Sequence, residues 1–245
     1  MHVALVAVGD TFVQEALVAI RSLQELAKVT ATIHVFTDDA LLFAGTNVEV
    51  HKVSSMPAAE AAGLRLRIPD LLHLQVGDDV VYMDPDIVAL HELPPVDWNS
   101  GKVHVYGYPH RTQREPSFAG FISQDDIILN QVAFNSGLLM FRFTEEIQEA
   151  FREASLAYAT FLNSGRALCC WEQPFVNEVL CRRNLACRCL TPFVWELRNL
   201  TGRTDAHVLV HGCGRRGERL QELTELVEAH CQEKGAAAAG ALDDI

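Results

Sequence analysis

The sequence has little positive charge and no long apolar run, and both shortages narrow the choice of partners. Its 245 residues include 20 Lys and Arg against 32 Asp and Glu, which gives a formal net charge of −12. This excess of acid argues against a nucleic-acid backbone or an anionic membrane surface as the main partner. No stretch reaches about 18 uninterrupted apolar residues, so we expect no membrane span.

The N-terminal segment also lacks the features of a targeting signal. The apolar run Met1–Val8 has no basic region, and Gly9 and Asp10 end it well short of a signal peptide or a membrane span. We therefore expect a cytoplasmic protein. The alternative at this stage is a catalytic domain excised from a longer chain.

No CxxC pair occurs among the seven cysteines, all of which lie from Cys169 onwards. A domain of this size needs no disulfide framework, so the free thiols favour a reducing compartment. Cys187 and Cys189 alternate along a predicted strand and share one face, which is compatible with a soft-metal site. Reduced thiols that fill a core are the interpretation we favour.

Apolar runs alternate with amphipathic segments, a pattern that predicts a layered α/β fold with a mainly parallel sheet. The predicted strands are His2–Val8, Thr32–Phe36, Asn47–Val53, Asp79–Met83, Val103–Tyr108, Leu138–Phe143, Leu185–Leu190 and Ala206–Val210. The predicted helices are Phe12–Leu26, Ala58–His73 with an interruption at Pro69, Glu145–Leu162, Glu172–Arg182 and Gly217–Cys231. No internal repeat or linker-like stretch occurs, so we expect one domain over residues 1–234 and a disordered Ala-rich tail over 235–245.

Acidic or turn residues follow three of the predicted strands, at Gly9-Asp10-Thr11, Asp38-Asp39 and Asp84-Pro85-Asp86. In an open α/β sheet, ligands bind outside the carboxyl ends of the strands. Two carboxylates two positions apart after a buried strand can face one divalent cation, and hard oxygen ligands suit Mg²⁺ or Mn²⁺ shared with phosphate oxygens. The alternative is an ordinary turn, because an isolated Asp-x-Asp is weak evidence of a site.

Five segments occur in the order and at the spacing of a known pattern. They are Arg65–Pro69, Val81–Val88, Phe134–Met140, Glu172–Asn177 and Val210–Gly214. The set resembles glycosyltransferase family 8, whose pattern has an R-L-x-I-P helix, a Y-x-D-x-D strand end, an F-N-x-G strand, an acid-Gln-x-x-x-N helix and a late His-x-x-Gly. The resemblance extends from the first strand to about residue 216. It implies a single GT-A domain, with a Rossmann-like, mainly parallel but mixed sheet flanked by helices, and a retaining glycosyltransferase.

The resemblance also implies a metal and a donor. Asp84 and Asp86 would bind Mn²⁺, with Mg²⁺ as an alternative, and the ion would bridge the two phosphates of a UDP-sugar. His211 is similar to the third protein ligand of the family, and an imidazole beside carboxylates suits Mn²⁺ better than Mg²⁺. The alternative for His211 is a strand-end histidine satisfied by hydrogen bonds.

Further residues are assigned to the donor sugar by the same resemblance. Arg65 matches the arginine that faces the diphosphate and the sugar, whereas its neighbour Arg67 matches nothing and is expected at the surface. The segment Asn135-Ser136-Gly137 matches the sugar-contacting F-N-x-G. Gln173 matches the glutamine near the anomeric carbon, and Glu172 matches the preceding acid, usually Asp in the family. Their alternative is an ordinary first helical turn, where an acid is favoured anyway.

Two strand ends are candidates for binding the nucleoside. Asp10 and Thr11 align approximately with the base-binding residues after the first strand of the family. Asp38 is a candidate for contact with the base or the ribose by its position alone.

One departure from the family pattern concerns the phosphates. After its late histidine the family has H-x-x-G-x-x-K-P-W, whose lysine reaches the diphosphate, whereas here Gly214 is followed by Arg215 and Arg216. Either arginine would supply the missing charge, since guanidinium pairs well with phosphate. The loss of the lysine bears on donor closure and on rate, and it leaves the metal site intact.

Other functions remain open at this stage. A sugar-1-phosphate nucleotidyltransferase would need a glycine-rich, lysine-bearing N-terminal loop, which Gly9-Asp10-Thr11-Phe12 is not. A catalytically silent UDP-sugar-binding module is the alternative from a different class, and the missing K-P-W motivates it. For the acceptor, a glycan, a protein and a small molecule are all open alternatives. The irregular segment over residues 109–126, with Arg111, Arg114 and Phe118, is either its side of the cleft or a plain surface loop.

Overall fold

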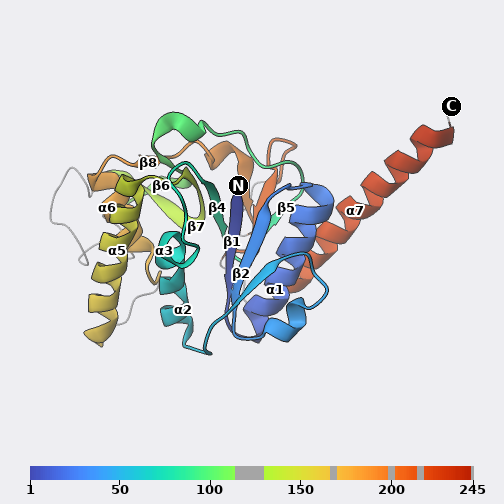
Figure 1. Cartoon of the computed structure of the whole chain (residues 1–245). Helices are drawn as coiled ribbons and strands as arrows, with labels where there is room; N and C mark the ends of the chain where they lie inside the picture. The colour runs from blue at the N-terminus through green and yellow to red at the C-terminus, as the bar shows by residue number, and fades with distance from the viewer. Residues whose placement is uncertain (114–129, 166–169, 198–201, 214–217, 244–245) are drawn as a thin grey trace.

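The computed structural model describes residues 1–113, 130–165, 170–197, 202–213 and 218–243 (Figure 1). Within these residues lies a seven-stranded sheet in the order β3-β2-β1-β4-β7-β6-β8. Its strands are β1 (His2–Ala7), β2 (Thr32–Thr37), β3 (Glu49–Lys52), β4 (Asp79–Met83), β6 (Val103–Thr112), β7 (Val132–Arg142) and β8 (Ala186–Cys187). Neighbouring strands are parallel except that β7 is antiparallel to both β4 and β6. The predicted mainly parallel, mixed sheet is confirmed.

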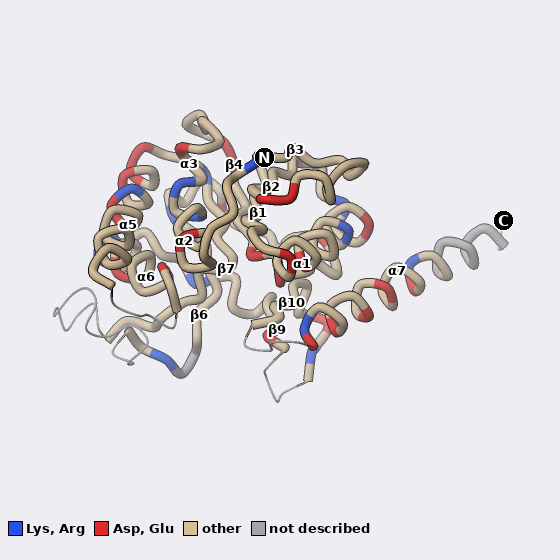
Figure 2. Tube along the Cα trace, turned by 90° about the horizontal axis from the view of Figure 1, so that it is seen from below, with Lys and Arg blue, Asp and Glu red and all other residues tan. Residues whose placement is uncertain are grey.

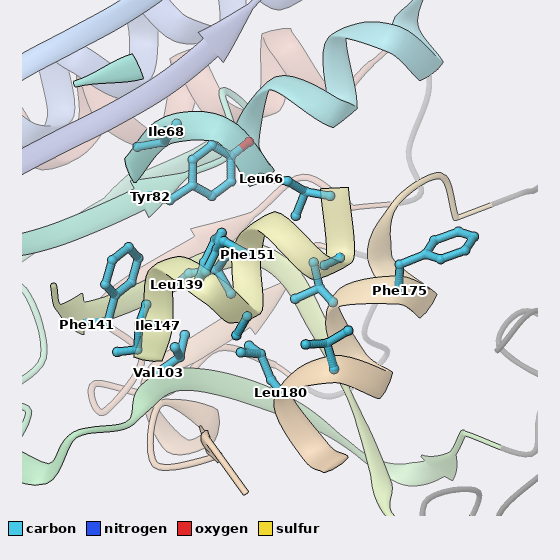
Figure 3. Packing of buried hydrophobic residues seen from close by; sticks show 14 of the residues in the cluster. Leu66, Ile68, Tyr82, Val103, Leu139, Phe141, Ile147, Phe151, Phe175 and Leu180 are labelled. Carbon is cyan, nitrogen blue, oxygen red and sulfur yellow. The ribbon is translucent and has the colours of Figure 1, made fainter. Parts of the chain in front are cut away.

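Helices cover both faces of this sheet (Figure 1). They are α1 (Asp10–Arg21), continued by the π-helical η1 (Ser22–Leu26), α2 (Ala58–Leu64), η3 (Arg65–Arg67), α3 (Ile68–Leu71), α5 (Glu145–Asn163), α6 (Gln173–Arg182) and α7 (Arg219–Asp243). Short 3₁₀ turns are η2 (Ala40–Phe43), η4 (Trp98–Ser100) and η5 (Thr191–Phe193). The apolar side of α1 packs on one face through Val13, Ala16 and Ile20. On the other face, α2, α5 and α6 enclose a core that includes Phe151 and Phe175 (Figure 3).

Local chemistry explains where several helices begin and end. The predicted helix Ala58–His73 is divided into α2, η3 and α3, because Pro69 lacks an N–H and is accommodated only in the first turn of a new segment. Thr144 caps α5, since its hydroxyl accepts a hydrogen bond from the Ile147 N–H at 3.2 Å.

A second, three-stranded sheet was not predicted as such. It has the order β5-β10-β9, with β5 (Ile87–Ala89), β10 (Leu209–His211) and β9 (Val194–Glu196). Strands of three residues are too short to show a periodic pattern, so β5 and β9 were missed. The sheet matters because it sets the end of β10 beside the turn that follows β4.

Other predicted boundaries need correction. The predicted strand Leu185–Leu190 contributes only β8 to the sheet, whereas β6 extends past Tyr108 to Thr112 because it pairs there with the start of β7. The remainder of the segment predicted as a loop, from residue 114, lies outside the described residues. The last helix, α7, continues beyond the predicted end at Cys231 into the Ala-rich segment, and alanine is the best helix former. Figures 1 and 2 show α7 extending away from the body of the molecule.

Candidate functional site

The turn after β4 brings three potential metal ligands together. Asp84 and Asp86 follow the buried strand, and His211 ends β10. One ligand atom from each of the three lies within 4.8 Å of the other two. This proximity arises from the second sheet, in which His211 pairs with Ile87, the residue after Asp86. Two carboxylates and an imidazole at this separation form a donor set that fits a divalent cation.

Gly137 makes room for one of these carboxylates. The Asp84 N–H donates to the Gly137 carbonyl at 2.7 Å. A Cβ atom on Gly137 would lie 2.5 Å from Oδ2 of Asp84 and 2.9 Å from Oδ1 of Asn135. Any side chain at this position would therefore displace Asp84, which gives the glycine of the F-N-x-G segment a steric reason.

Arg65 lies between two carboxylates, that of Asp84 in the turn after β4 and that of Glu172 just before α6. Its Nη2 lies 3.0 Å from Oδ1 of Asp84, and its Nη1 lies 2.9 Å from Oε1 of Glu172 and 3.2 Å from Oγ of Ser136. The guanidinium also covers the ring of Tyr82, whose hydroxyl donates to Asp84. Burial disfavours the charge on Arg65, but the two carboxylates outweigh it and raise the pKa above its ordinary value. Arg65 is therefore a buried cation that lines the site.

The F-N-x-G segment is tied to the first turn of α6. The Ser136 N–H donates to Oε1 of Gln173 at 3.1 Å, and the Ser136 hydroxyl donates to Oε1 of Glu172 at 2.8 Å. One turn along α6, the Asn177 amide accepts from the Phe134 N–H and donates to its carbonyl, both at 2.8 Å. The asparagine of the acid-Gln-x-x-x-N pattern thus holds α6 against β7. Burial raises the pKa of Glu172, although the neighbouring guanidinium opposes the rise.

The Asn135 side chain is held from both ends of its amide. Oδ1 accepts from the Gly137 N–H at 2.7 Å, and Nδ2 lies 2.6 Å from the hydroxyl oxygen of Tyr108. Asn135 is itself buried at the end of the cavity described below. A polar group fixed in this way is suited to recognising one ligand orientation.

Asp86 and His211 form an ion pair. Nε2 of His211 lies 3.3 Å from Oδ1 of Asp86, and Nδ1 contacts the hydroxyl of Tyr106. Burial acts most strongly on both groups and opposes their charges. Their mutual attraction outweighs burial, so the pKa of Asp86 is lowered, with a further contribution from Arg219, and the pKa of His211 is raised.

One cation at this site was missed in the sequence analysis. Arg219, the first residue of α7, has Nη1 3.1 Å from Oδ2 of Asp86 and Nη2 2.9 Å from Oε2 of Glu15. Glu15 is fully buried, and burial raises its pKa despite the opposing effect of Arg219. The sequence held one signal for Arg219. A cation was expected after the late histidine in place of the family lysine, and the sequence analysis assigned this role to Arg215 or Arg216.

A cavity of about 930 Å³ opens over these groups. It is lined by predicted site residues from six places in the chain: Asp10, Thr11, Arg65, Asp84, Asp86, Asn135, Ser136, Glu172, Gln173 and His211. Residues that were not predicted also line it, namely Phe12, Glu15, Tyr108, Trp171 and Arg219. The convergence of so many polar groups in one concave region makes it the candidate active site.

The other predicted site residues are placed differently. Asp38 is not among the lining residues, and its Oδ1 accepts a hydrogen bond from the Gly9 N–H at 3.0 Å, which braces the turn after β1. Arg111 lines the cavity and stacks over the Tyr108 ring. Gly214 and Arg215 lie outside the described residues, as do Arg114, Phe118 and Arg216. The side chain of Arg67 is exposed, as predicted.

Comparison with known proteins decides the family. The sequence profile of glycosyl transferase family 8 matches residues 2–189 of the chain. The chain belongs to glycosyltransferase family 8. The matched residues include β1, the Asp84-Pro85-Asp86 turn and α6, and the protein is a glycosyltransferase.

Solved structures agree on the fold of this family 8 protein. The galactosyltransferase LgtC, in complex with donor and acceptor sugar analogs, is similar with a TM-score of 0.61 and 16% identity. The match covers 92% of this chain and 95% of LgtC, and an active-site mutant of LgtC gives the same values. At this identity the likeness establishes the predicted GT-A fold. No curated protein matched in the corresponding sequence search.

None of the helices in the described part of this glycosyltransferase combines the length and the apolar character that a membrane crossing needs.

Proposed function

We propose that this glycosyltransferase moves a hexose or pentose from a UDP-sugar to an acceptor, with retention of the anomeric configuration and with Mn²⁺ held by Asp84, Asp86 and His211. The observation that carries the proposal is the meeting of these three ligand atoms within 4.8 Å in a cavity of about 930 Å³. Oxygen and imidazole ligands together suit Mn²⁺, and Mg²⁺ is the alternative.

The charges around the proposed ligands support binding of an anionic donor. When bound, the metal would neutralise charge on the diphosphate and so assist departure of the nucleotide. Asp84 and Asp86 already lie against Arg65 and Arg219, so cations surround both carboxylates. We assign to Arg219 the phosphate contact that a lysine makes in the family, because it begins α7 and lines the cavity.

Arg65 has a different role in this proposal. It lies between two carboxylates of the site, Asp84 and Glu172, and also donates to Ser136. It therefore positions the two carboxylates and adds positive potential beneath the donor. Asp10 and Thr11, at the start of α1 and on the cavity wall, are assigned to the nucleoside.

The state of Glu172 supports retention without a covalent intermediate. A double displacement would require a free nucleophile beside the anomeric carbon. Glu172 is only 1% exposed and is held by Arg65 and by Ser136, so it is not available for attack. We infer that the acceptor hydroxyl attacks on the face of the leaving group. The bond from C1 to the acceptor oxygen forms as the bond from C1 to the diphosphate breaks, and the hydroxyl proton passes to a diphosphate oxygen.

Glu172 and Gln173 stabilise the positive charge that develops at the anomeric carbon in this mechanism. Gln173 is oriented by the Ser136 N–H, and Glu172 is held by Arg65. Asn135 is assigned to a sugar hydroxyl, because its amide faces the same cavity. Electrostatic stabilisation of this kind is often the largest single contribution of an enzyme to rate.

The test is release of UDP from a panel of UDP-sugars with and without Mn²⁺, for the wild type and for Asp86→Asn. We expect metal-dependent release with one sugar and loss of it in the variant. Asp70→Asn is the matched control, since Asp70 pairs with Arg152 at the surface. NMR of the product establishes the anomeric configuration, and a β-linked product from an α-linked donor would contradict retention.

Two other outcomes would replace the proposal. Mn²⁺-dependent binding of UDP without release from any sugar would identify a silent binding module. Pyrophosphate release from a nucleoside triphosphate and a sugar 1-phosphate would identify a nucleotidyltransferase.

A further inference from the structure

A cluster of histidines and carboxylates lies near the amino ends of the parallel strands, whereas the candidate active site lies at their carboxyl ends. Nδ1 of His34 is 3.1 Å from Nε2 of His51 and 3.2 Å from Oε2 of Glu49. Nε2 of His34 is 3.0 Å from Nδ1 of His2, whose Nε2 faces Oδ2 of Asp78 at 3.8 Å. The five side chains thus form a connected chain across β1, β2, β3 and the start of β4.

The sheet register produces this cluster. His34 on β2 pairs directly with Glu49 on the edge strand β3, and Phe36 pairs with His51. Because side chains two residues apart share a face, all four project to the same side of the sheet. The Phe36 ring stacks on the His51 ring with centroids 4.6 Å apart and planes 16° apart, which fixes the imidazole orientation.

Protons alone satisfy the chain of imidazoles but leave one contact without a donor. If Nε2 of His51 donates to Nδ1 of His34, then Nε2 of His34 donates to Nδ1 of His2, and Nε2 of His2 directs its proton at Asp78. The lone pair of His34 Nδ1 then faces Oε2 of Glu49 at 3.2 Å, and neither atom carries a proton.

His34 is 5% exposed, so its Nδ1 lies away from solvent between an imidazole nitrogen and a carboxylate oxygen. Each of these three atoms can give an electron pair to the same cation.

We propose that Nδ1 of His34, Nε2 of His51 and Oε2 of Glu49 bind Zn²⁺. Two nitrogen or oxygen ligands of tetrahedral zinc are separated by about 3.3 Å, and the two separations at His34 Nδ1 are 3.1 and 3.2 Å. One ligand atom from each of the three residues lies within 4.8 Å of the others.

Zinc at this position satisfies every neighbouring group. Nδ1 of His34 becomes a ligand, while Nε2 keeps its proton and donates it to His2. His2 then carries its proton on Nε2, directed at Asp78. A ligand histidine that donates to a second group, itself oriented by a carboxylate, is the usual outer-shell arrangement of zinc sites.

The zinc ion would connect the edge strand β3 to β2 and leave one coordination position open. Glu49 and His51 lie on β3, whose side chains are otherwise mainly exposed, and His34 lies on the buried β2. The Glu49 side chain is 62% exposed, so the fourth position of the zinc faces solvent. The site would stabilise the fold independently of sugar transfer.

The test uses the Asp86→Asn protein after chelator treatment, so that the proposed active-site ligands do not compete. This protein also carries Cys189→Ser, which removes a thiol from the group His104, Cys187 and Cys189, a second possible zinc site. We expect one Zn²⁺ equivalent by calorimetry and by native mass spectrometry. With free Zn²⁺ at about 100 times Kd, the Tm should rise by roughly 5–10 °C. Adding Glu49→Gln or His51→Ala should weaken binding at least about tenfold.

Controls distinguish this proposal from the proposed function. Glu228→Gln removes an exposed charge on α7 and should leave the zinc equivalent in place. Glu49→Gln changes an exposed side chain, so it remains informative if His51→Ala is unstable. In the otherwise wild-type protein, Glu49→Gln should leave UDP release unchanged. Absence of zinc binding in the Asp86→Asn protein, or binding unaffected by both additional changes, would overturn the site.

Discussion

Nη1 of Arg219 lies 3.1 Å from Oδ2 of Asp86, so the last helix contacts the turn that follows the fourth strand. The same guanidinium pairs with Glu15 of α1, a side chain with no exposed surface. One residue therefore connects a proposed metal ligand to the first helix, and its replacement should affect activity and stability by separable routes.

Arg219→Met should lower kcat/KM for the UDP-sugar about 10- to 100-fold, the effect of losing a hydrogen bond to a charged group. It should also lower the free energy of unfolding by about 3 kcal/mol, because Glu15 remains buried without its partner. Steady-state kinetics and urea titration measure the two effects.

The double variant Glu15→Gln/Arg219→Met separates the effect of Arg219 on activity from its effect on stability. We expect it to recover much of the stability but none of the activity. Arg152→Met is the matched control, and loss of its surface pair with Asp70 should cost less than about 1 kcal/mol. Unchanged kcat/KM in Arg219→Met would exclude a phosphate contact by this residue.

Arg65 and Arg67 provide a second comparison within one short segment. Arg65→Met leaves Asp84 and Glu172 without their shared cation, so we expect loss of about 3–5 kcal/mol of stability and at least about 100-fold in kcat/KM. Arg67→Met changes an exposed side chain and should alter stability by less than about 0.5 kcal/mol. Equal effects of the two replacements would contradict the positioning role of Arg65.

The third prediction concerns space for Asp84. In Gly137→Ala the added methyl would lie 2.5 Å from Oδ2 of Asp84 and force the carboxylate to move. A displacement of about 1 Å can cost 100-fold in rate, and Mn²⁺ affinity should fall in parallel. Gly202→Ala is the control, because a Cβ there meets nothing within 4 Å. Normal Mn²⁺ affinity in Gly137→Ala would show that Asp84 is not a ligand.

Much of the central sheet could be predicted because its strands carry strong local signals. The buried runs that form β1, β2 and β4 end at turns rich in aspartate, so their carboxyl ends were found within about one residue. The Asp84-Pro85-Asp86 turn and the Asn135-Ser136-Gly137 segment are contiguous in sequence, and order and spacing were enough to associate them.

Contacts made by tertiary packing were not predictable in the same way. Arg219 reaches Asp86 only because the three-residue strands β5 and β10 bring the start of α7 to the site, and such strands show no periodicity. Likewise, His34 and His51 meet because of the register of β2 on β3, which a single sequence does not specify. Because both contacts depend on long-range strand pairing, neither the role of Arg219 nor the histidine cluster was predicted from the sequence.

The buried imidazole of His34 gives a prediction for the metal-free protein. His2, Glu49 and His51 face it, and burial lowers its pKa from 6.5 to about 4. Since the unfolded chain binds the proton more readily, the stability that His34 contributes is present above pH 6.5 and is lost as the pH falls towards 4. The maximal loss from this one group is about 3 kcal/mol.

Urea titration in EDTA at a series of pH values between 7 and 4 measures this loss. His34→Phe keeps an aromatic ring but cannot titrate, so the stability of the wild type relative to this variant should fall as the pH falls. Leu156→Ala, which replaces an exposed side chain without a titratable group, should keep a constant difference from wild type. A constant difference for His34→Phe as well would mean that the proton enters His34 equally in the folded and unfolded chains, and the imidazole would then not be held neutral by burial.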